Sequence, residues 1–304
     1  MRVLVTGAGG YIGGAVVRAL ASEGHDPIAL VHVSSPAFPP SVEVRRGDVT
    51  RPESLLSALN SVESVCHLAG LTRVRESWAQ PMRYFEANVS GTVALLAAME
   101  KMDVGRIVFA STSAISGTPE RQPMTEDLPD DPPHPYAASK AAAESAIHWQ
   151  TRTGRLSAVV LRLFNAAGGG DPDPTRIVPR VVAVARGRSA ILEVNGDGTA
   201  MRDFVHIDDV AEAFVAAVEH EQPPGEFSRF NIGSGRGASV MDVVTAAERV
   251  TGQAIPVVHR PPAAEAPILV ADPSRALESL GWKPRRSKLD AIVRYEWQAS
   301  GFST

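Results

Sequence analysis

The stretch "LVTGAGGYIGGAVVRALASEGH", Leu4–His25, decides the fold. It joins a short apolar run to three glycines, Gly7, Gly10 and Gly13, and then to a segment whose apolar residues recur at helical spacing. Glycines at such a turn let the backbone approach a pyrophosphate, and the free N–H groups of the following helix attract the phosphates. A strand, a glycine turn and a helix in this order are typical of a dinucleotide site, although the glycines alone also suit a simple tight turn.

The same alternation of strand and helix continues through the first half of the chain. Strands are expected at residues 3–6, 27–33, 42–45, 64–68, 106–110 and 158–163, and helices at 12–23, 53–59, 81–102 and 136–152. This order predicts a doubly wound parallel sheet with helices on both faces. Beyond residue 166 the pattern is less regular, with helices expected at 208–219 and 239–251. We therefore expect a Rossmann-type α/β domain over residues 1–165. Residues 166–304 should form a smaller α/β substrate lobe, with some late segments returning to the sheet.

The composition narrows the class of protein. An apolar fraction of 44% and a charged fraction of 21% are ordinary for a globular chain. The net charge of −4 gives no overall attraction to nucleic acid or anionic lipid. Cys66 is the single cysteine, which excludes an internal disulfide and a cysteine-based metal cluster. Because the sequence shows no signal-peptide pattern and no apolar run of roughly 20 residues, we expect a cytoplasmic protein that binds neither membrane nor metal.

A second pattern, "YAASK", places Tyr136 four residues before Lys140, so both side chains lie on one face of a helix. An ammonium group near a phenol stabilises the phenolate. It should lower the pKa of Tyr136 from about 10 toward neutrality, as a base that accepts a sugar hydroxyl proton requires. The hydroxyl cluster "FASTS" ends an upstream strand, and we expect Ser111 or Thr112 to complete a proton relay.

The adenosine end of a bound dinucleotide is marked less clearly. His32 ends the second predicted strand, where an acidic residue that holds the adenine ribose is expected. The sequence therefore leaves NAD and NADP open. Asp48 follows the third strand and suits a contact to the adenine amino group, although it suits an ordinary loop carboxylate equally well.

Together these segments resemble the extended short-chain dehydrogenases/reductases, and among them the NAD-dependent epimerase/dehydratase family that acts on nucleotide sugars. The resemblance covers essentially the whole chain. It rests on "VTGAGGYIG" (5–13), "HLAG" (67–70), "NVSGT" (88–92), "FASTSAISG" (109–117), "PYAASK" (135–140), "LRLFNAAG" (161–168), "GDGTAMRDFVHIDDVA" (196–211) and "HRP" (259–261). The segment at 196–211 is the most specific of these to the nucleotide-sugar branch.

The resemblance implies a role for each matching residue. The catalytic residues would be Thr112, Tyr136 and Lys140. The cofactor would be contacted by Gly7, Gly10, Tyr11, Ile12, Gly13, His32, Asp48, Val49, Leu68, Ala69, Gly70, Thr72, Asn88, Tyr136, Lys140 and Phe164. The substrate would be contacted by Arg75, Thr112, Tyr136, Asn165, Val178, Arg202 and Arg260. Arg202 and Arg260 would hold the diphosphate, because a guanidinium pairs with phosphate through two parallel hydrogen bonds.

The implied activity is NAD-dependent inversion at C4 of a nucleotide-diphospho-sugar through a transient 4-keto intermediate. The base, uridine or thymidine, and the sugar stay open. One alternative is a nucleotide-4-ketosugar reductase that uses NAD(P)H and releases it. The other is a non-catalytic NAD(P)-binding protein, which the intact Tyr136 and Lys140 disfavour. In the family, the helices at 81–102 and 136–152 form a dimer face, so a homodimer is expected.

Several positions depart from the family pattern. Ser113 and Ala114 replace the acidic pair of the 4,6-dehydratases, so dehydration is not expected. Ser116 replaces a tyrosine that lines the sugar pocket in relatives, which predicts a wider or more polar pocket. Thr72 replaces a lysine that touches the cofactor, which predicts a looser grip. Arg75 adds positive charge near the sugar end and keeps a carboxylated sugar as a candidate.

Overall fold

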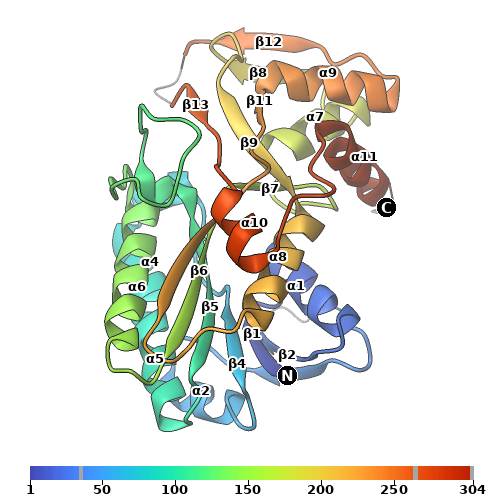
Figure 1. Cartoon of the computed structure of the whole chain (residues 1–304). Coiled ribbons are helices and arrows are strands. Elements are labelled where there is room, and N and C mark those ends of the chain that lie inside the picture. The colour runs from blue at the N-terminus through green and yellow to red at the C-terminus, as the bar shows by residue number, and fades with distance from the viewer. Residues whose placement is uncertain (34–36, 263–265, 302–304) are drawn as a thin grey trace.

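The computed structural model describes residues 1–33, 37–262 and 266–301. Within these ranges, seven parallel strands form a sheet in the order β10-β6-β5-β4-β1-β2-β3 (Figure 1). Their bounds are β1 Arg2–Thr6, β2 Asp26–Val31, β3 Glu43–Arg46, β4 Ser64–His67, β5 Arg106–Thr112, β6 Ser157–Leu163 and β10 Phe227–Ile232. The order reverses between the paired strands β1 and β4, which creates the crevice where ligands bind in doubly wound sheets. The predicted Rossmann-type fold is confirmed.

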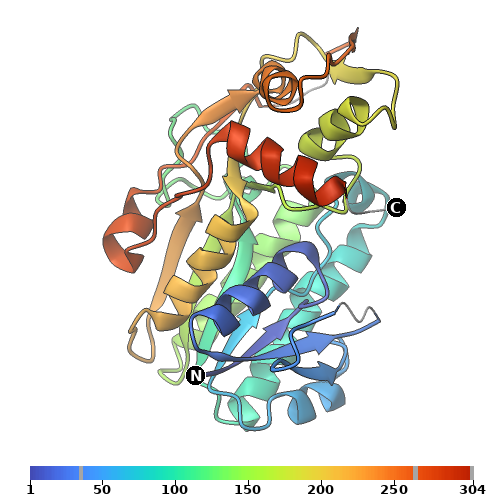
Figure 2. The same cartoon turned by 90° about the vertical axis from the view of Figure 1, so that its right-hand side faces the viewer.

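Helices cover both faces of this sheet. One face carries α2 (Pro52–Ala58), α5 (Gly91–Lys101) and α6 (Pro135–Thr151). The other carries α1 (Tyr11–Ser22) and α8 (Ile207–Glu219), which lie side by side in Figure 2. Alternate strand residues serve alternate faces, so Val3 and Val5 pack under α1 and α8 whereas Leu4 packs with the opposite layer. Burial on both sides explains why β1 is an unbroken apolar run.

The single helix predicted over 81–102 is interrupted. The structure has α4 (Pro81–Phe85), a π-helical turn at Glu86–Ser90, and then α5. A short helix that the sequence did not predict, α3 (Val74–Ala79), precedes them. The π turn places Asn88 inside the protein, and π turns are frequently found at functional sites.

The C-terminal part forms a smaller lobe above the strand ends. Its core lies among α7 (Ile177–Ala185), α9 (Val240–Thr251) and α11 (Leu289–Ser300). Its strands are β7 (Asn165–Ala167), β8 (Leu192–Asn195), β9 (Met201–His206), β11 (Gly237–Ser239), β12 (Val257–Arg260) and β13 (Ile268–Leu269). Although β10 and α8 come after residue 166, both belong to the main sheet layer, and α10 (Ser274–Leu280) packs on β10. Across the described ranges, no helix is both long and apolar enough to cross a membrane.

Candidate active site

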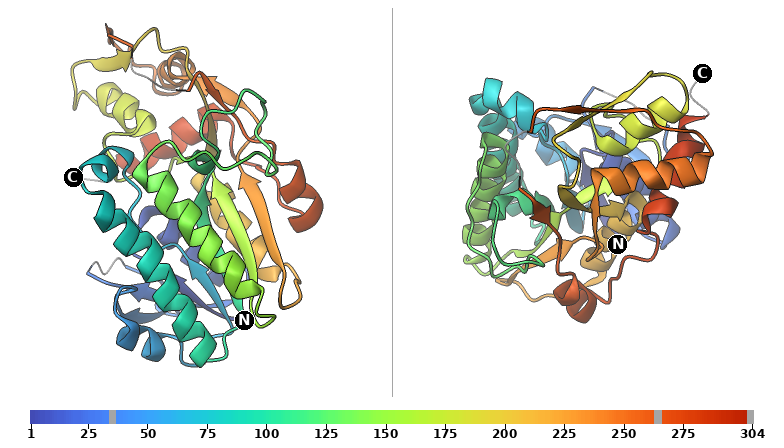
Figure 3. Two further views of the ribbon diagram at one scale, coloured as in Figure 1. Left: turned by 90° about the vertical axis from the view of Figure 1, so that its left-hand side faces the viewer. Right: turned by 90° about the horizontal axis from the view of Figure 1, so that it is seen from above.

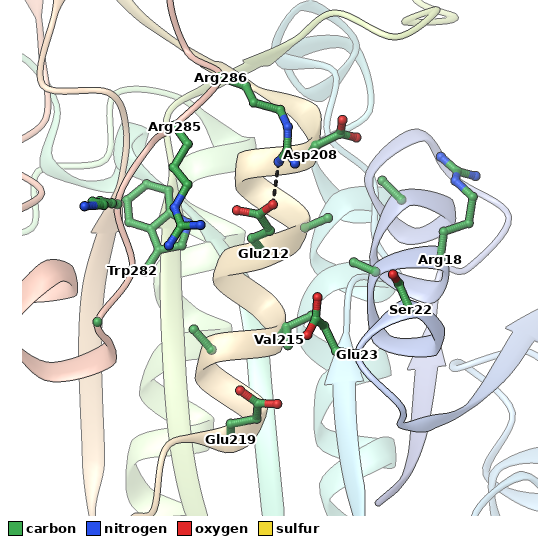
Figure 4. A pocket seen from close by; sticks show the side chains of 16 residues that line it. Arg18, Ser22, Glu23, Asp208, Glu212, Val215, Glu219, Trp282, Arg285 and Arg286 are labelled. Carbon is green, nitrogen blue, oxygen red and sulfur yellow. Dashed lines mark hydrogen bonds and ion pairs between the residues drawn. The ribbon is translucent and has the colours of Figure 1, made fainter.

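Two large depressions, a groove and a cavity, are candidates for the functional site. The groove between α1 and α8 has a volume of about 520 Å³, and Figure 4 shows the acidic and basic side chains along it, with Arg286 bonded to Glu212. None of the residues predicted from the sequence lines this groove. A cavity of about 640 Å³ lies instead at the carboxyl ends of β1, β4 and β5, beneath the lobe. The glycine turn and the predicted catalytic residues line this second cavity, which makes it the candidate active site.

The glycine turn is packed so closely that a side chain would clash at two of its three glycines. Gly7 has φ +69°, and a Cβ on it would lie 2.7 Å from the backbone nitrogen of Ala69, beyond β4. A Cβ on Gly13 would lie 2.1 Å from the carbonyl oxygen of Gly7. Gly10 stands at the N-cap of α1 without a side chain that could cap the helix, so the first N–H groups of α1 are left for a ligand.

The proton-transfer residues meet on the opposite wall. Thr112 ends β5, and its side chain is hydrogen-bonded to the phenol of Tyr136 at the start of α6. One turn later, the buried Lys140 places its Nζ 4.1 Å from the ring centroid of Phe109. The imidazole of His134 stacks on the Tyr136 ring with centroids 5.8 Å apart. The structure therefore brings the three predicted catalytic residues together.

The pKa of Tyr136 does not move in the predicted direction. Burial raises it, because a phenolate loses hydration inside the protein. The Thr112 hydrogen bond and the charge of Arg176 lower it, but by less. Burial also lowers the pKa of Lys140 to about 7, against the opposing charge of Glu144. The predicted fall in the Tyr136 pKa is thus wrong for the protein chain by itself, because burial also disfavours the ammonium form of Lys140 that was expected to cause it.

Most of the predicted cofactor residues line the cavity, and a few lie outside it. On the wall are Gly7, Gly10, Tyr11, Ile12, Gly13, Leu68, Ala69, Gly70, Thr72 and Phe164. Asn88 lies beneath the wall, where it bonds to the backbone N–H and carbonyl of Leu71 and shapes that segment. Val49 packs toward Gly91, at the start of α5. His32 and Asp48 lie at neighbouring strand ends, 3.5 Å apart, at the position expected for the adenosine end.

The predicted substrate residues divide in the same way. Asn165, Val178 and Arg202 line the cavity, and Asn165 is held by a 3.1 Å hydrogen bond to the carbonyl of Asp203. Arg75 is exposed on α3 and is absent from the cavity wall. Arg260 is also absent from it, because the pairing of β12 with β8 holds its guanidinium against Glu193 on the lobe surface.

Ser116 is likewise not where the sequence suggested. It is buried below the cavity and its hydroxyl contacts Arg162 at 3.4 Å, so it does not widen the pocket. Sequence reasoning also missed Arg176, which lines the cavity and pairs with Asp171 at 3.0 Å. These two residues follow a run of three positive-φ glycines that gives no periodic signal. Only the DPDPTR charge pattern could have drawn attention to them.

Comparisons with known proteins find one family in sequence and in structure. The model of the NAD dependent epimerase/dehydratase family matches residues 3–233. The UDP-glucose 4-epimerase of Lacticaseibacillus casei is 36% identical over 318 residues, covering 98% of this chain and 96% of the relative. Among solved structures, UDP-glucose 4-epimerase from Stenotrophomonas maltophila, with bound NAD and formylated UDP-arabinopyranose, superposes with a TM-score of 0.93 at 29% identity, covering 99% of this chain and 98% of that one. MoeE5 in complex with UDP-glucuronic acid and NAD has a TM-score of 0.90 at 30% identity, with both chains fully covered. The chain belongs to the NAD-dependent epimerase/dehydratase family.

Proposed function

We propose that this protein is an NAD-dependent 4-epimerase of a nucleotide-diphospho-sugar. The observation that carries the proposal is the meeting of Thr112, Tyr136 and Lys140 in one cavity whose opposite wall is the glycine turn. The relatives support it, because those compared above include proteins named UDP-glucose 4-epimerase and a structure with bound NAD.

The residues of the cavity divide the chemistry between them. Gly7, Gly10 and Gly13 would hold the pyrophosphate of NAD against the N-terminus of α1. Bound NAD⁺ would accept a hydride from C4 of the sugar and return it to the other face, so the reaction has no net oxidation. Tyr136 accepts the proton of the 4-hydroxyl and later returns it. Arg202, on the lobe side, would face the diphosphate.

The reaction needs the one titratable proton of the Tyr136–Lys140 pair to lie on Lys140. The reactive form has Tyr136 as phenolate and Lys140 as ammonium, because the base needs a free electron pair and the ammonium stabilises the phenolate. Thr112 donates a hydrogen bond to the phenol oxygen, which favours the same form. Arg176 contributes a further positive charge.

The test is direct. Purified protein is incubated with a panel of UDP- and dTDP-sugars, and C4 inversion is followed by NMR. Inversion without added reductant, together with NAD(H) released on denaturation, supports an epimerase. An empty cofactor site and NADPH-dependent reduction of a 4-ketosugar would instead identify the reductase and refute the proposal.

A uronate substrate is a second candidate that one observation favours. Arg176 places a guanidinium on the cavity wall near Tyr136, and MoeE5 is a neighbour solved with UDP-glucuronic acid. Because Arg176 forms an ion pair with Asp171, only part of its positive charge is available to a sugar carboxylate. If the substrate is a uronate, Arg176→Gln should lower kcat/KM for UDP-glucuronic acid at least tenfold more than for UDP-glucose. Equal losses would exclude this role.

We further propose a homodimer built on the helices α4, α5 and α6, which lie side by side in the left panel of Figure 3. Large apolar side chains on this face are exposed, including Met82 at 71% and Trp149 at 68%. A patch of this kind commonly marks an interface. Trp149→Glu should convert a dimer into monomers in light scattering, whereas Leu277→Glu, at an exposed leucine on α10, should not. A cytoplasmic location is likewise part of the proposal.

A further inference from the structure

A buried carboxyl group lies under the proton-transfer residues and has no role in the mechanism above. Glu144 follows Lys140 by four residues on α6, as Lys140 follows Tyr136, so the three side chains form one stripe along the helix. Glu144 is only 2% exposed. A buried carboxylate is costly unless it is hydrogen-bonded and paired with a positive charge.

The partners of Glu144 come from two strands of the sheet. The hydroxyl of Ser111, on β5, donates to its Oε1. Arg162, on β6, donates from Nε to Oε1 at 3.1 Å and from Nη2 to Oε2 at 2.8 Å. Ser111 and Arg162 are direct neighbours in the β5–β6 register. One carboxylate thus joins α6 to both strands, one residue before the catalytic Thr112.

The charges around this carboxylate nearly balance. Arg162 is 1% exposed and also bonds to Asp130 at 2.8 Å. Arg229, on β10, is a third exposed and lies 3.3 Å from Oε2 of Glu144. Of the titratable groups around the pair, His67 from β4 lies near Lys140, whereas Arg162 from β6 and Arg229 from β10 contact Glu144. One contact further out, Asp130 from the loop before α6 pairs with Arg162, and Tyr84 from α4 packs against the ring of Tyr136. Burial, with help from the charge of Lys140, lowers the pKa of His67 to about 3, so His67 carries no charge near neutral pH.

We propose that Glu144 is a positioning residue for the reaction, which keeps Lys140 in its ammonium form and ties the Ser111–Thr112 strand end to the helix face of Tyr136. Two observations support it: the direct Ser111–Glu144–Arg162 bonding, and the placement of the one carboxylate of this stripe a single turn from a buried lysine. Glu144 opposes the effect of burial on the pKa of Lys140. A buried ion pair is by itself weak evidence for a stabilising role. The catalytic readout rests on the proposed function, but the titration below does not.

The first experiment measures the titration of Lys140 directly. The chain has four lysines, so lysine-labelled protein saturated with NAD gives a simple NMR spectrum, and Lys140→Met assigns the signal. Glu144→Gln keeps the shape but removes the charge, and the titration midpoint of Lys140 should fall by about one pH unit. An unchanged midpoint would overturn the proposal, whether or not the protein is an epimerase.

Two further variants separate the electrostatic effect from damage to the fold. Arg229→Gln removes a partly exposed positive charge beside Glu144, so the Lys140 midpoint should rise, by less than it falls in Glu144→Gln. Should Glu144→Gln fail to fold alone, the double variant Glu144→Gln/Arg229→Gln, which removes both charges of the pair, takes its place. A Lys140 midpoint below that of Arg229→Gln supports the proposal, and an equal midpoint refutes it. Glu126→Gln is the matched control, since this buried glutamate accepts the N–H of Asn231 and does not act on Lys140. The Lys140 midpoint in Glu126→Gln should match that in the unaltered protein.

The kinetic readout is the pH profile of epimerisation. Because the reactive form needs a protonated Lys140, the loss of kcat in Glu144→Gln should grow from almost none near pH 5 to about tenfold near pH 8. A purely structural defect would lower kcat by the same factor at both pH values, and that result would reject the proposal.

Discussion

Gly7→Ala tests the claim that close packing of the glycine turn on β4 creates the cofactor site. The added methyl group would lie 2.7 Å from the nitrogen of Ala69 and 2.8 Å from the carbonyl carbon of Leu68. Both are backbone atoms of the segment that follows β4, so neither can swing aside as the end of a flexible side chain could. The backbone of Gly7, at φ +69°, is also unfavourable for alanine.

These two effects set the magnitude. A left-handed backbone costs alanine about 1–2 kcal/mol. Forcing a methyl group into close-packed atoms costs typically about 1–3 kcal/mol. Together they lower the free energy of unfolding by about 2–5 kcal/mol, which corresponds to a fall in Tm of roughly 3–8 °C for a chain of 304 residues. NAD should also raise the Tm of Gly7→Ala by less than it raises that of the unaltered protein, because the glycine turn proposed to hold the pyrophosphate is displaced.

The assay is thermal unfolding with and without saturating NAD, compared with Gly14→Ala in the first turn of α1. A Cβ on Gly14 would meet its nearest neighbour, a flexible arginine, at 3.5 Å, which is ordinary contact. Since Gly14 lies inside α1, alanine there should raise the free energy of unfolding by about 0.5–1 kcal/mol. If Gly7→Ala matched Gly14→Ala in stability and in its response to NAD, the close approach of the turn to β4 would not be what makes the site.

Three further outcomes are expected. Tyr136→Phe should lower turnover by roughly 10²–10⁴-fold with nucleotide affinity nearly unchanged, measured by NMR and calorimetry, and normal turnover would remove Tyr136 from the mechanism. The rate should rise with pH up to about 7, because the Lys140–Tyr136 pair loses its first proton there. Above that pH the rate should level off, because the one proton that the pair keeps is divided between Lys140 and Tyr136 in a ratio that does not depend on pH. A rate that fell across this range would contradict the assignment. Ser239→Ala, which removes the capping box with Asp242 at the start of α9, should cost about 1 kcal/mol in urea unfolding and leave turnover intact.

The parts of the site that the sequence revealed are those fixed by local spacing. The glycine turn and the Tyr136–Lys140 stripe each lie within one strand–helix or helical segment, so residue spacing alone determines their geometry. Arg260 shows the limit of such reasoning, because the pairing of β12 with β8 decides which way it faces, and no local pattern encodes that pairing. Arg176 shows the converse, since a loop with three left-handed glycines carries it to the cavity. The direction of the Tyr136 pKa was missed for a related reason: spacing shows the neighbouring charge but not the burial that outweighs it.

The lobe wall opposite Tyr136 is set by hydrogen bonds to the sheet, and the segment "RDF" shows how. Arg202 and Asp203 are adjacent on β9, so their side chains point to opposite sides of the strand. Arg202 lines the cavity, whereas Asp203 is fully buried. The carboxylate of Asp203 accepts hydrogen bonds of 2.6–3.1 Å from Ser234, Gly235 and Ala271. Because Ser234 lies two residues after the end of the edge strand β10, this bonding ties the strand that carries Arg202 to the sheet that carries the proposed catalytic residues. This bonding connects the strand of Arg202 to the sheet that carries Tyr136, so if Arg202 holds the diphosphate as proposed, Asp203→Asn should raise KM for the nucleotide sugar by displacing that strand.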